Sequence, residues 1–437
     1  MKKLINEAQT CGAIANASLQ AELTPPFLGG VNSLQCAKAF VFSLIFFLLL
    51  PNETIVCAEE GSSRSFANAQ DEPSDDLKNS PKFQINGSYK NLFTTTQSRT
   101  SKENFYADLN RLRLEFKQQM DPWSFYLTLD NETIINDFAN TADFELIRSK
   151  TQEKLTSADL DKVSVDNDHL YLKHSIHRAY VKYYQEKFQA TIGKQSIDWG
   201  KMRFYSPLDV FNTLSPIDLD KDNRLGIDAL NFNFSPEAFS GMNMVLAPGE
   251  NYEKTNLGLN LTKKVSTYDL ALIFASIKKD EVLGLSFDGY LKDMGLRGEI
   301  SQTRQDSHKD FLRISLGADY NFTDKIYALL EHFFNGGHDD NDPSALTTSY
   351  RAFQKILSLK KHLTSFFLKI TLTPLIQFNH SVIYDWDGKS TVYNPEMRYN
   401  IITNVDLAVG VQLFFGGDNS EFGDYEHLYY AELKWFF

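Results

Sequence analysis

The chain ends in the sequence YYAELKWFF, at positions 429–437. The odd-numbered positions of this stretch carry apolar or aromatic side chains, namely Tyr429, Ala431, Leu433, Trp435 and Phe437. Charged side chains stand between them at Glu432 and Lys434. Because successive side chains of a β-strand point to opposite faces, this alternation predicts a strand with one apolar and one charged face.

The same period-two pattern runs from Phe83 to the end of the chain, for example over 106–117, 123–130, 312–320 and 407–415. Aromatic residues make up 13% of the chain, while its mean hydropathy is −0.33. The apolar run Ala39–Leu50 is shorter than the ~20 residues that a membrane-spanning helix needs. A transmembrane β-barrel has this composition, because its strands distribute apolar side chains by alternation. Soluble all-β proteins show the same alternation, so only the lengths of the connections between strands can distinguish a soluble protein from a membrane barrel.

The connections alternate between tight turns and longer loops. The predicted turns lie at 121–122, 185–186, 235–237, 292–293, 323–324, 373–374 and 403–404, and the predicted loops at 96–104, 131–168, 196–225, 249–254, 305–310, 335–358 and 416–424. Short periplasmic turns with longer outer loops are typical of outer-membrane barrels. We therefore predict an all-β fold, a transmembrane antiparallel up-and-down barrel of about 18 strands over 83–437. The number falls to 16 if 282–291 and 294–304 do not form strands.

The first 58 residues have the order of a signal segment. Lys38 precedes the apolar run Ala39–Leu50, and Val56-Cys57-Ala58 is a small-residue cleavage site. A single membrane anchor is the alternative. Since 37 residues precede Lys38, we expect that the start codon is assigned too far upstream. All three cysteines lie before residue 59, so the mature chain would carry no thiol in an oxidising periplasm. Residues 59–82 are polar and predict a disordered leader.

The alternating last strand with its C-terminal Phe437 resembles the signal read by the barrel-assembly machinery of Gram-negative bacteria. This resemblance implies an exported protein of the cell outer membrane, in contact with that machinery, with lipid and with lipopolysaccharide. Aromatic side chains near strand ends, such as Trp123, Tyr183 and Trp435, match interfacial girdles. The formal net charge of −12 argues against a nucleic-acid partner.

The face that alternates with the apolar one carries many charges, and these predict a hydrated lumen because an Arg or Lys facing lipid costs about 2–4 kcal/mol. Nine cationic and six anionic side chains belong to this set: Arg111, Arg113, Glu115, Lys117, Arg178, Lys182, Arg297, Glu299, Arg313, Asp319, Glu331, Glu396, Arg398, Glu432 and Lys434. The excess favours a modest anion preference. Paired charges and selection by size are the alternative.

The segment 192–230 differs from the other connections in its length and in its two prolines, Pro207 and Pro216. Its pattern is carried by Gly193, Lys194, Gln195, Trp199, Gly200, Arg203, Pro207, Asp209, Phe211, Asn212 and the run Gly226-Ile227-Asp228-Ala229. This block resembles one found in porin-like outer-membrane proteins, and it is similar to a block of the alginate-export porins. Lys194 stands where those families usually have arginine, which puts a guanidinium-specific contact there in doubt.

A loop that carries Phe204, Phe211, Leu214 and Leu219 would expose apolar surface to water if it extended outward. We therefore expect 196–225 to fold into the barrel and narrow it, with charged side chains at the constriction. The charged residues expected there are Arg203 and Arg224, opposite Asp209, Asp218, Asp220 and Asp222. The alternative is an outer loop that caps the rim.

The sequence predicts a porin, a passive channel for small hydrophilic solutes, anionic ones among them, with no cofactor and no metal. Two other classes stay open: an exporter of a polyanionic exopolysaccharide, which would need a continuous basic track, and a structural barrel with a plugged lumen. The spacing of Asp218, Asp220 and Asp222 begins like a calcium loop, but Asn223 and Ala229 replace the required glycine and glutamate. His174 and Ser175 would point to opposite faces of a strand, so we expect no enzyme.

Overall fold

The computed structural model describes residues 83–97, 102–137, 160–167, 169–211, 215–220, 224, 226–249, 255–277, 279–305, 309–338, 358–418 and 420–437. The predicted signal segment 1–58 and leader 59–82 lie outside the described residues. Within the described ranges, the structure contains no helix that is long and apolar enough to cross a membrane.

Strands account for most of the described chain. In order they are β1 (Phe83–Gln97), β2 (Asn104–Met120), β3 (Trp123–Asn136), β4 (Asp161–Asp166), β5 (Leu170–Gln185), β6 (Phe188–Gln195), β7 (Ile227–Phe234), β8 (Ser240–Ala247), β9 (Asn256–Val265), β10 (Tyr268–Ile277), β11 (Asp280–Leu291), β12 (Met294–Arg304), β13 (Phe311–Thr323), β14 (Ile326–Asn335), β15 (His362–Thr373), β16 (Ile376–Asp385), β17 (Ser390–Ile402), β18 (Val405–Phe415) and β19 (Leu428–Phe436).

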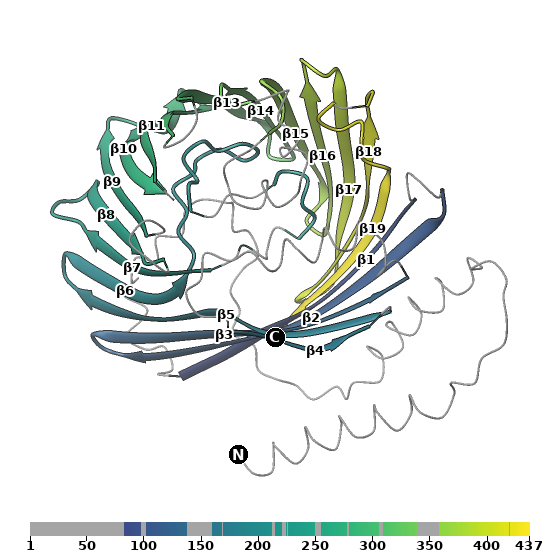
Figure 1. Ribbon diagram of the computed structural model, residues 1–437, viewed down its shortest axis with the longest axis horizontal. Coiled ribbons are helices and arrows are strands. Elements are labelled where there is room, and N and C mark those ends of the chain that lie inside the picture. Colours follow the sequence, from purple (N-terminus) through teal and green to yellow (C-terminus); the bar gives the residue numbers. More distant parts are fainter. Residues whose placement is uncertain are drawn as a thin grey trace, which may run out of the picture. The chain divides into compact units, whose positions relative to one another are not determined.

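The strands form one closed antiparallel barrel (Figure 1). Closure depends on the pairing of β1 with β19, which runs from Ser88↔Phe436 to Thr96↔Leu428. Eighteen strands make the ring, and β4 is an addition that pairs with the outer part of β5, where β6 no longer reaches. The stretches 282–291 and 294–304 form β11 and β12, so the prediction of 18 strands is confirmed over the alternative of 16.

Tight turns gather at one end of the barrel, as predicted, but three short connections were not predicted. Ser266-Thr267 joins β9 to β10 at the periplasmic end. At the opposite end, 278–279 joins β10 to β11, and 386–389 joins β16 to β17. Ser266 and Lys279 have positive φ angles of 58° and 75°, although neither is a glycine. The outer connections are therefore not uniformly long.

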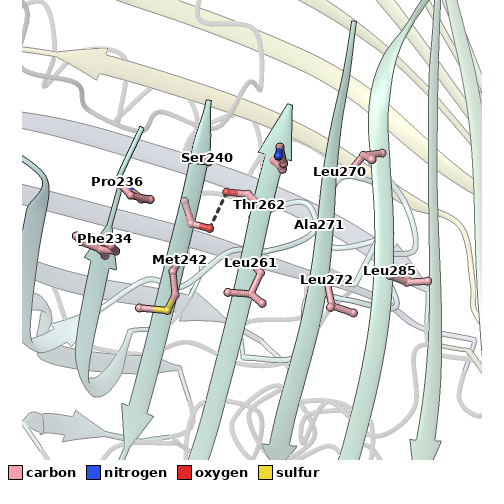
Figure 2. A pocket seen from close by; sticks show the side chains of 12 residues that line it. Phe234, Pro236, Ser240, Met242, Leu261, Thr262, Leu270, Ala271, Leu272 and Leu285 are labelled. Atoms are coloured by element: carbon pink, nitrogen blue, oxygen red, sulfur yellow. Dashed lines mark hydrogen bonds between the residues drawn. The ribbon is translucent and has the colours of Figure 1, made fainter. Parts of the chain in front are cut away.

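The outward face of the sheet is a band of exposed apolar side chains. Met242, Leu261, Leu272 and Leu285 stand directly opposite one another across four neighbouring strands, so they form one row. Figure 2 shows this row, together with Phe234, around a shallow apolar groove on β7–β11. Side chains of this kind fit a lipid surface and would be costly against water.

The inward face alternates with this row and is polar at many positions. Ser286, Glu299 and Ser315 are directly opposite one another on β11, β12 and β13, and all three are buried. On β14 and β15, Glu331 and Ser365 form a similar buried pair. Because these side chains lie inside a closed ring, the groups that cover them must come from a connecting segment.

The outward position of Leu285 generates a stability prediction. Its side chain is 53% exposed near the middle of β11, so Leu285→Arg should lower the unfolding free energy in lipid vesicles by about 2–4 kcal/mol. The turn substitution Asp324→Arg is the control and should change this energy by less than about 1 kcal/mol. Guanidinium titration of the folded, heat-modifiable form measures both. Equal effects of the two variants would contradict the assignment of this face to lipid.

Candidate pore constriction

The segment 196–226 leaves β6 and returns to β7 after contacting inward-facing side chains around much of the barrel. Its described residues are 196–211, 215–220, 224 and 226. Figure 1 shows part of it in teal, inside the ring of strands. We call this segment the inner loop.

The first part of the inner loop packs its apolar side chains against the wall. Trp199 and Phe211 meet edge to face, with ring centroids 5.0 Å apart, and both are buried. They join Leu208 in an apolar cluster with wall residues that include Ile273 and Val245. The indole Nε1 of Trp199 donates a hydrogen bond of 2.9 Å to Asn243 Oδ1. The segment thus buries the apolar side chains that would be costly in water.

The wall has a glycine at two positions where the inner loop comes closest to it. A Cβ atom added at Gly258 would lie 2.4 Å from the Trp199 ring, and one at Gly284 would lie 2.2 Å from Leu208 Cδ2. Larger side chains at these two positions would therefore displace the inner loop from the wall.

Two wall carboxylates bind the backbone of the inner loop. Glu299 accepts hydrogen bonds from Lys201 N, from Ser206 Oγ at 2.7 Å and from Leu208 N at 3.1 Å. Glu331 accepts from Arg203 N at 2.9 Å and from Phe204 N at 3.0 Å. Four backbone N–H groups that no strand pairs are satisfied in this way, which is the usual requirement for buried backbone.

Aromatic stacking adds a second contact between the inner loop and the wall, close to Glu331. Tyr205 lies parallel to Phe333, with a centroid distance of 5.1 Å and an interplanar angle of 5°. Ser315 Oγ donates to the Tyr205 carbonyl at 2.7 Å. These contacts and the two carboxylates hold residues 201–208 against β12–β15.

Arg203 is an exposed cation among the described residues of the inner loop. Its side chain is solvent-exposed, and its guanidinium carbon lies 3.7 Å from the centre of the Phe367 ring. A guanidinium over an aromatic face is stabilised by the ring quadrupole. The expected partners of Arg203 were aspartates of the same loop, but its backbone N–H contacts Glu331 and its side chain stacks on the wall.

The second part of the loop is held by ion pairs. Asp220 lies 3.0 Å from Lys90 Nζ and 2.5 Å from Arg111 Nη2. Nearby, Gln412 Nε2 donates to the Ile217 carbonyl at 2.7 Å. Burial by itself would raise the pKa of Asp220, but Arg111 and Lys90 outweigh burial and hold the pKa below its usual range.

Arg224 does pair within the loop, as expected. Its guanidinium lies 2.6 Å from Asp198 and 3.4 Å from Asp209. Arg178 of β5 donates a hydrogen bond to the Arg224 carbonyl. Of the other expected aspartates, Asp218 donates its N–H to the Ser215 carbonyl at 3.2 Å, and Asp222 lies outside the described residues.

The block that carried the resemblance anchors the two ends of the inner loop. Gly193 has a φ angle of 122°, and a Cβ there would lie 2.2 Å from the Ala179 carbonyl oxygen. Lys194 Nζ donates to the Ile176 carbonyl at 2.5 Å, and Gln195 Nε2 donates to the Ala229 carbonyl at 2.9 Å. Asp228 stands opposite Lys194 in the β6–β7 register.

Gly200 and Pro207, which also belong to this block, lie within the inner loop. A Cβ at Gly200 would lie 2.4 Å from Ser206 Oγ, so the chain approaches itself closely there. Pro207 is buried next to Leu208.

The remaining predicted lumen residues lie at different heights of the wall. Arg113 binds Asp130 through two nitrogens, at 2.7 and 2.6 Å. Lys182 lies over the rings of Tyr126 and Tyr180 near the periplasmic end. Arg398 is 3.4 Å from Glu396 and 4.0 Å from Glu432.

Arg313 lies at the outer end of β13, away from the inner loop. It is buried there, and its Nε donates to Asn335 Oδ1 at 3.0 Å.

The C-terminal residues that were expected to form the assembly signal take part in closure or lie next to it. Phe437 exchanges backbone hydrogen bonds with Gly87, at 2.7 and 2.9 Å. Tyr429 is 54% exposed on the outward face, and Trp435 contacts the Phe437 ring at 4.8 Å. Leu433 is paired with Asn91 across the β1–β19 seam.

Several residues of the site were missed from the sequence. Lys90, Asp130 and Glu132 form ion pairs at the wall, and Asp198 pairs with Arg224. Asp130 alternates with apolar positions of its strand, so the sequence pattern was sufficient to predict that its side chain faces inward. Glu299 and Glu331 were expected to line the lumen, but nothing local marks them as loop anchors.

The carboxylate anchors generate a mutational prediction. In the double variant Glu299→Gln, Glu331→Gln, one acceptor oxygen of each side chain becomes an N–H donor that faces a backbone N–H. The loss of charged hydrogen bonds should raise the undocked population of the inner loop at least about tenfold. Single-channel current noise and protease cleavage within 196–226 should both increase. Glu237→Gln, in an exposed periplasmic turn, is the control.

The lowered pKa of Asp220 generates a pH prediction. A depressed folded-state pKa means that the ion pairs with Lys90 and Arg111 are fully present above the ordinary carboxyl pKa of about 4 and are lost as the pH falls through the depressed value. The extra channel noise of Asp220→Asn over the wild type should therefore stay constant from pH 7 to about 4 and shrink only below that, where the wild type also loses these ion pairs. Asp220→Asn should be noisy at pH 7. A quiet Asp220→Asn channel would contradict this role.

No protein-family model and no curated protein matches the sequence. Among solved structures, the barrel is similar to OccAB2 from Acinetobacter baumannii, with 8% sequence identity, coverage of 81% of this chain and 98% of that one, and a TM-score of 0.53. It is also similar to the outer membrane protein OprD from Pseudomonas aeruginosa, with 11% identity, coverage of 82% and 93%, and a TM-score of 0.52. The chain thus has the fold of outer-membrane porin barrels.

Proposed function

We propose that this chain is an outer-membrane channel through which small hydrophilic solutes diffuse passively. The observation that carries the proposal is the inner loop, whose first part is bound to the wall by Glu299 and Glu331 while Arg203 remains exposed. A segment fixed in this way narrows a wide barrel without depending on a separate plug. The apolar outward band supports placement in a membrane.

We further propose a modest preference for anions, centred on Arg203. Several of the wall cations counted from the sequence are neutralised, because Arg111 lies beside Glu132 and Arg113 beside Asp130. Because of this pairing, the excess of nine cationic over six anionic side chains on the lumen face contributes less to ion selectivity than the numbers suggest. A charged side chain at a narrow point has more influence on permeating ions than one at a wide point.

The exporter of a polyanionic polysaccharide is less well supported. Such an exporter would need a continuous track of cations available to the polymer. Lys90 and Arg111 instead bind Asp220, and Lys90 also lies 2.6 Å from Glu432. On β5, His174 and Ser175 face opposite sides of the sheet, which gives no support to a hydrolase.

Planar-bilayer recording tests the channel and its selectivity. The wild type should conduct, and in a salt gradient its reversal potential should indicate anion preference. Arg203→Ala should lower the anion-to-cation permeability ratio on the order of twofold and raise the conductance, because one charge and a long side chain leave the narrow point.

Arg304→Ala is the matched control, because Arg304 is an arginine at the outer rim with 75% of its side chain exposed. It should leave both quantities unchanged. A protein that folds but does not conduct would contradict the channel and favour a plugged barrel. Equal effects of the two variants would contradict the role of Arg203.

A further inference from the structure

A group of polar and aromatic side chains lies on the outward face, at the outer ends of β14, β15 and β16. We call it the outer-rim cluster, and it consists of His332, Phe334, Lys361, His362, Thr364 and Trp386. It is separate from the inner loop, because the side chains that alternate with it, Phe333 and Leu363, are the ones buried inside the ring.

The height of the cluster matches the edge of the apolar band. Leu372 and Phe366 are outward and exposed on β15, and His362 stands ten positions from Leu372 on the same strand. Ten residues of a strand tilted by about 40° rise about 25 Å, which is the height of the apolar band of an outer-membrane barrel. Because Leu372 lies next to the periplasmic turn, His362 lies at the level of the outer lipid headgroups.

The side chains of the cluster are held by one another. The Thr364 hydroxyl accepts a hydrogen bond from Trp386 Nε1 at 2.8 Å and lies 3.0 Å from His332 Nδ1. The rings of His332 and His362 are stacked at 5.8 Å, with an interplanar angle of 26°. Binding through Nδ1 leaves the Nε2 edge of the exposed His332 available to a ligand.

Lys361 adds a full positive charge to the same place. Its Nζ lies 5.5 Å from the centre of the Phe334 ring, and the Phe334 ring lies 5.3 Å from that of His362. The nearest carboxylate of the adjoining turn, Asp387, uses Oδ2 to accept the backbone N–H groups of Lys361 and His362, at 3.0 and 2.7 Å. Among the described residues, no ion pair joins Lys361, His332 or His362 to a carboxylate.

We propose that the outer-rim cluster binds a phosphate group of lipopolysaccharide in the outer leaflet. Lys361 supplies charge, His332 and His362 supply N–H donors, and the exposed Trp386 packs against the apolar part of the same lipid. A phosphorylated headgroup is the anion found at this height on the outside of the barrel. The proposal depends on the membrane placement of the barrel and does not depend on conduction.

The opposite rim offers a matched control. There Lys264 lies over the ring of Phe239, with Nζ 5.4 Å from the ring centre, almost the same geometry as Lys361 over Phe334. Lys264 is the residue before the end of β9, next to the periplasmic turn at 266–267. The described contacts of this pair include no histidine and no tryptophan, so Lys264→Gln controls for the loss of a lysine–aromatic pair in detergent, where lipid A can reach both rims.

The test is titration of the purified, folded chain in detergent with bisphosphorylated lipid A and with enzymatically dephosphorylated lipid A, followed by native mass spectrometry. The wild type and Lys264→Gln should bind the phosphorylated lipid about tenfold more tightly than the dephosphorylated one. The triple variant His332→Gln, Lys361→Gln, His362→Gln should lose this difference. The single variant Lys361→Gln should lose part of it, and it decides the matter if the triple variant does not fold.

Three results would overturn the proposal. One is a wild type that binds both lipids equally. Another is a loss of the preference in Lys264→Gln as large as that in Lys361→Gln. The third is displacement of lipid A by phosphatidylglycerol at equal concentration, which would show a general anion site and not a lipopolysaccharide site.

Discussion

The closure of the sheet by β1 and β19 is the constraint on which the rest of the structure depends. Lipid offers no hydrogen bonds, so a membrane-spanning strand must find partners on both edges. The pairing from Ser88↔Phe436 to Thr96↔Leu428, continued by the hydrogen bonds between Gly87 and Phe437, removes the last free edge of the ring. Once the ring is closed, alternation assigns each side chain to lipid or to the interior, and the C-terminal residue becomes part of the seam.

A ring of 18 strands encloses more space than the wall side chains fill, and the inner loop occupies part of it. A non-strand segment inside a barrel brings unpaired backbone N–H groups with it. Glu299 and Glu331 satisfy four of these groups, while Trp199, Leu208 and Phe211 bury apolar surface against apolar wall residues. Wall carboxylates thus act first as structural anchors, and their effect on permeating ions is secondary. The exposed Arg203 is held over Phe367 by the same arrangement.

The two faces of the barrel use charge differently. Inside, cations and carboxylates are close enough to neutralise one another, as in the contacts of Asp220 with Lys90 and Arg111. On the outside, charge is confined to the rims, where side chains reach water and headgroups. The outer-rim cluster and the Lys264–Phe239 pair occupy opposite rims with nearly the same lysine–aromatic geometry. The histidines and Trp386 near Lys361 distinguish the outer-rim cluster from the Lys264–Phe239 pair.

The sequence by itself determined the barrel, its 18 strands and the position of the long segment 196–225, because alternation and turn residues are local signals. It missed the outer turns at 278–279 and 386–389. The turn at 278–279 consists of two lysines without a glycine or proline, whereas Asp387-Gly388 is a local turn signal that was overlooked. The tertiary structure alone decided which charges meet. Lys90 and Asp220 are 130 positions apart, and Arg203 and Glu331 are 128 apart, so only closure brings them within hydrogen-bonding distance. Alternation states which face a side chain occupies, but the partner across the lumen depends on the curvature and register of the whole ring.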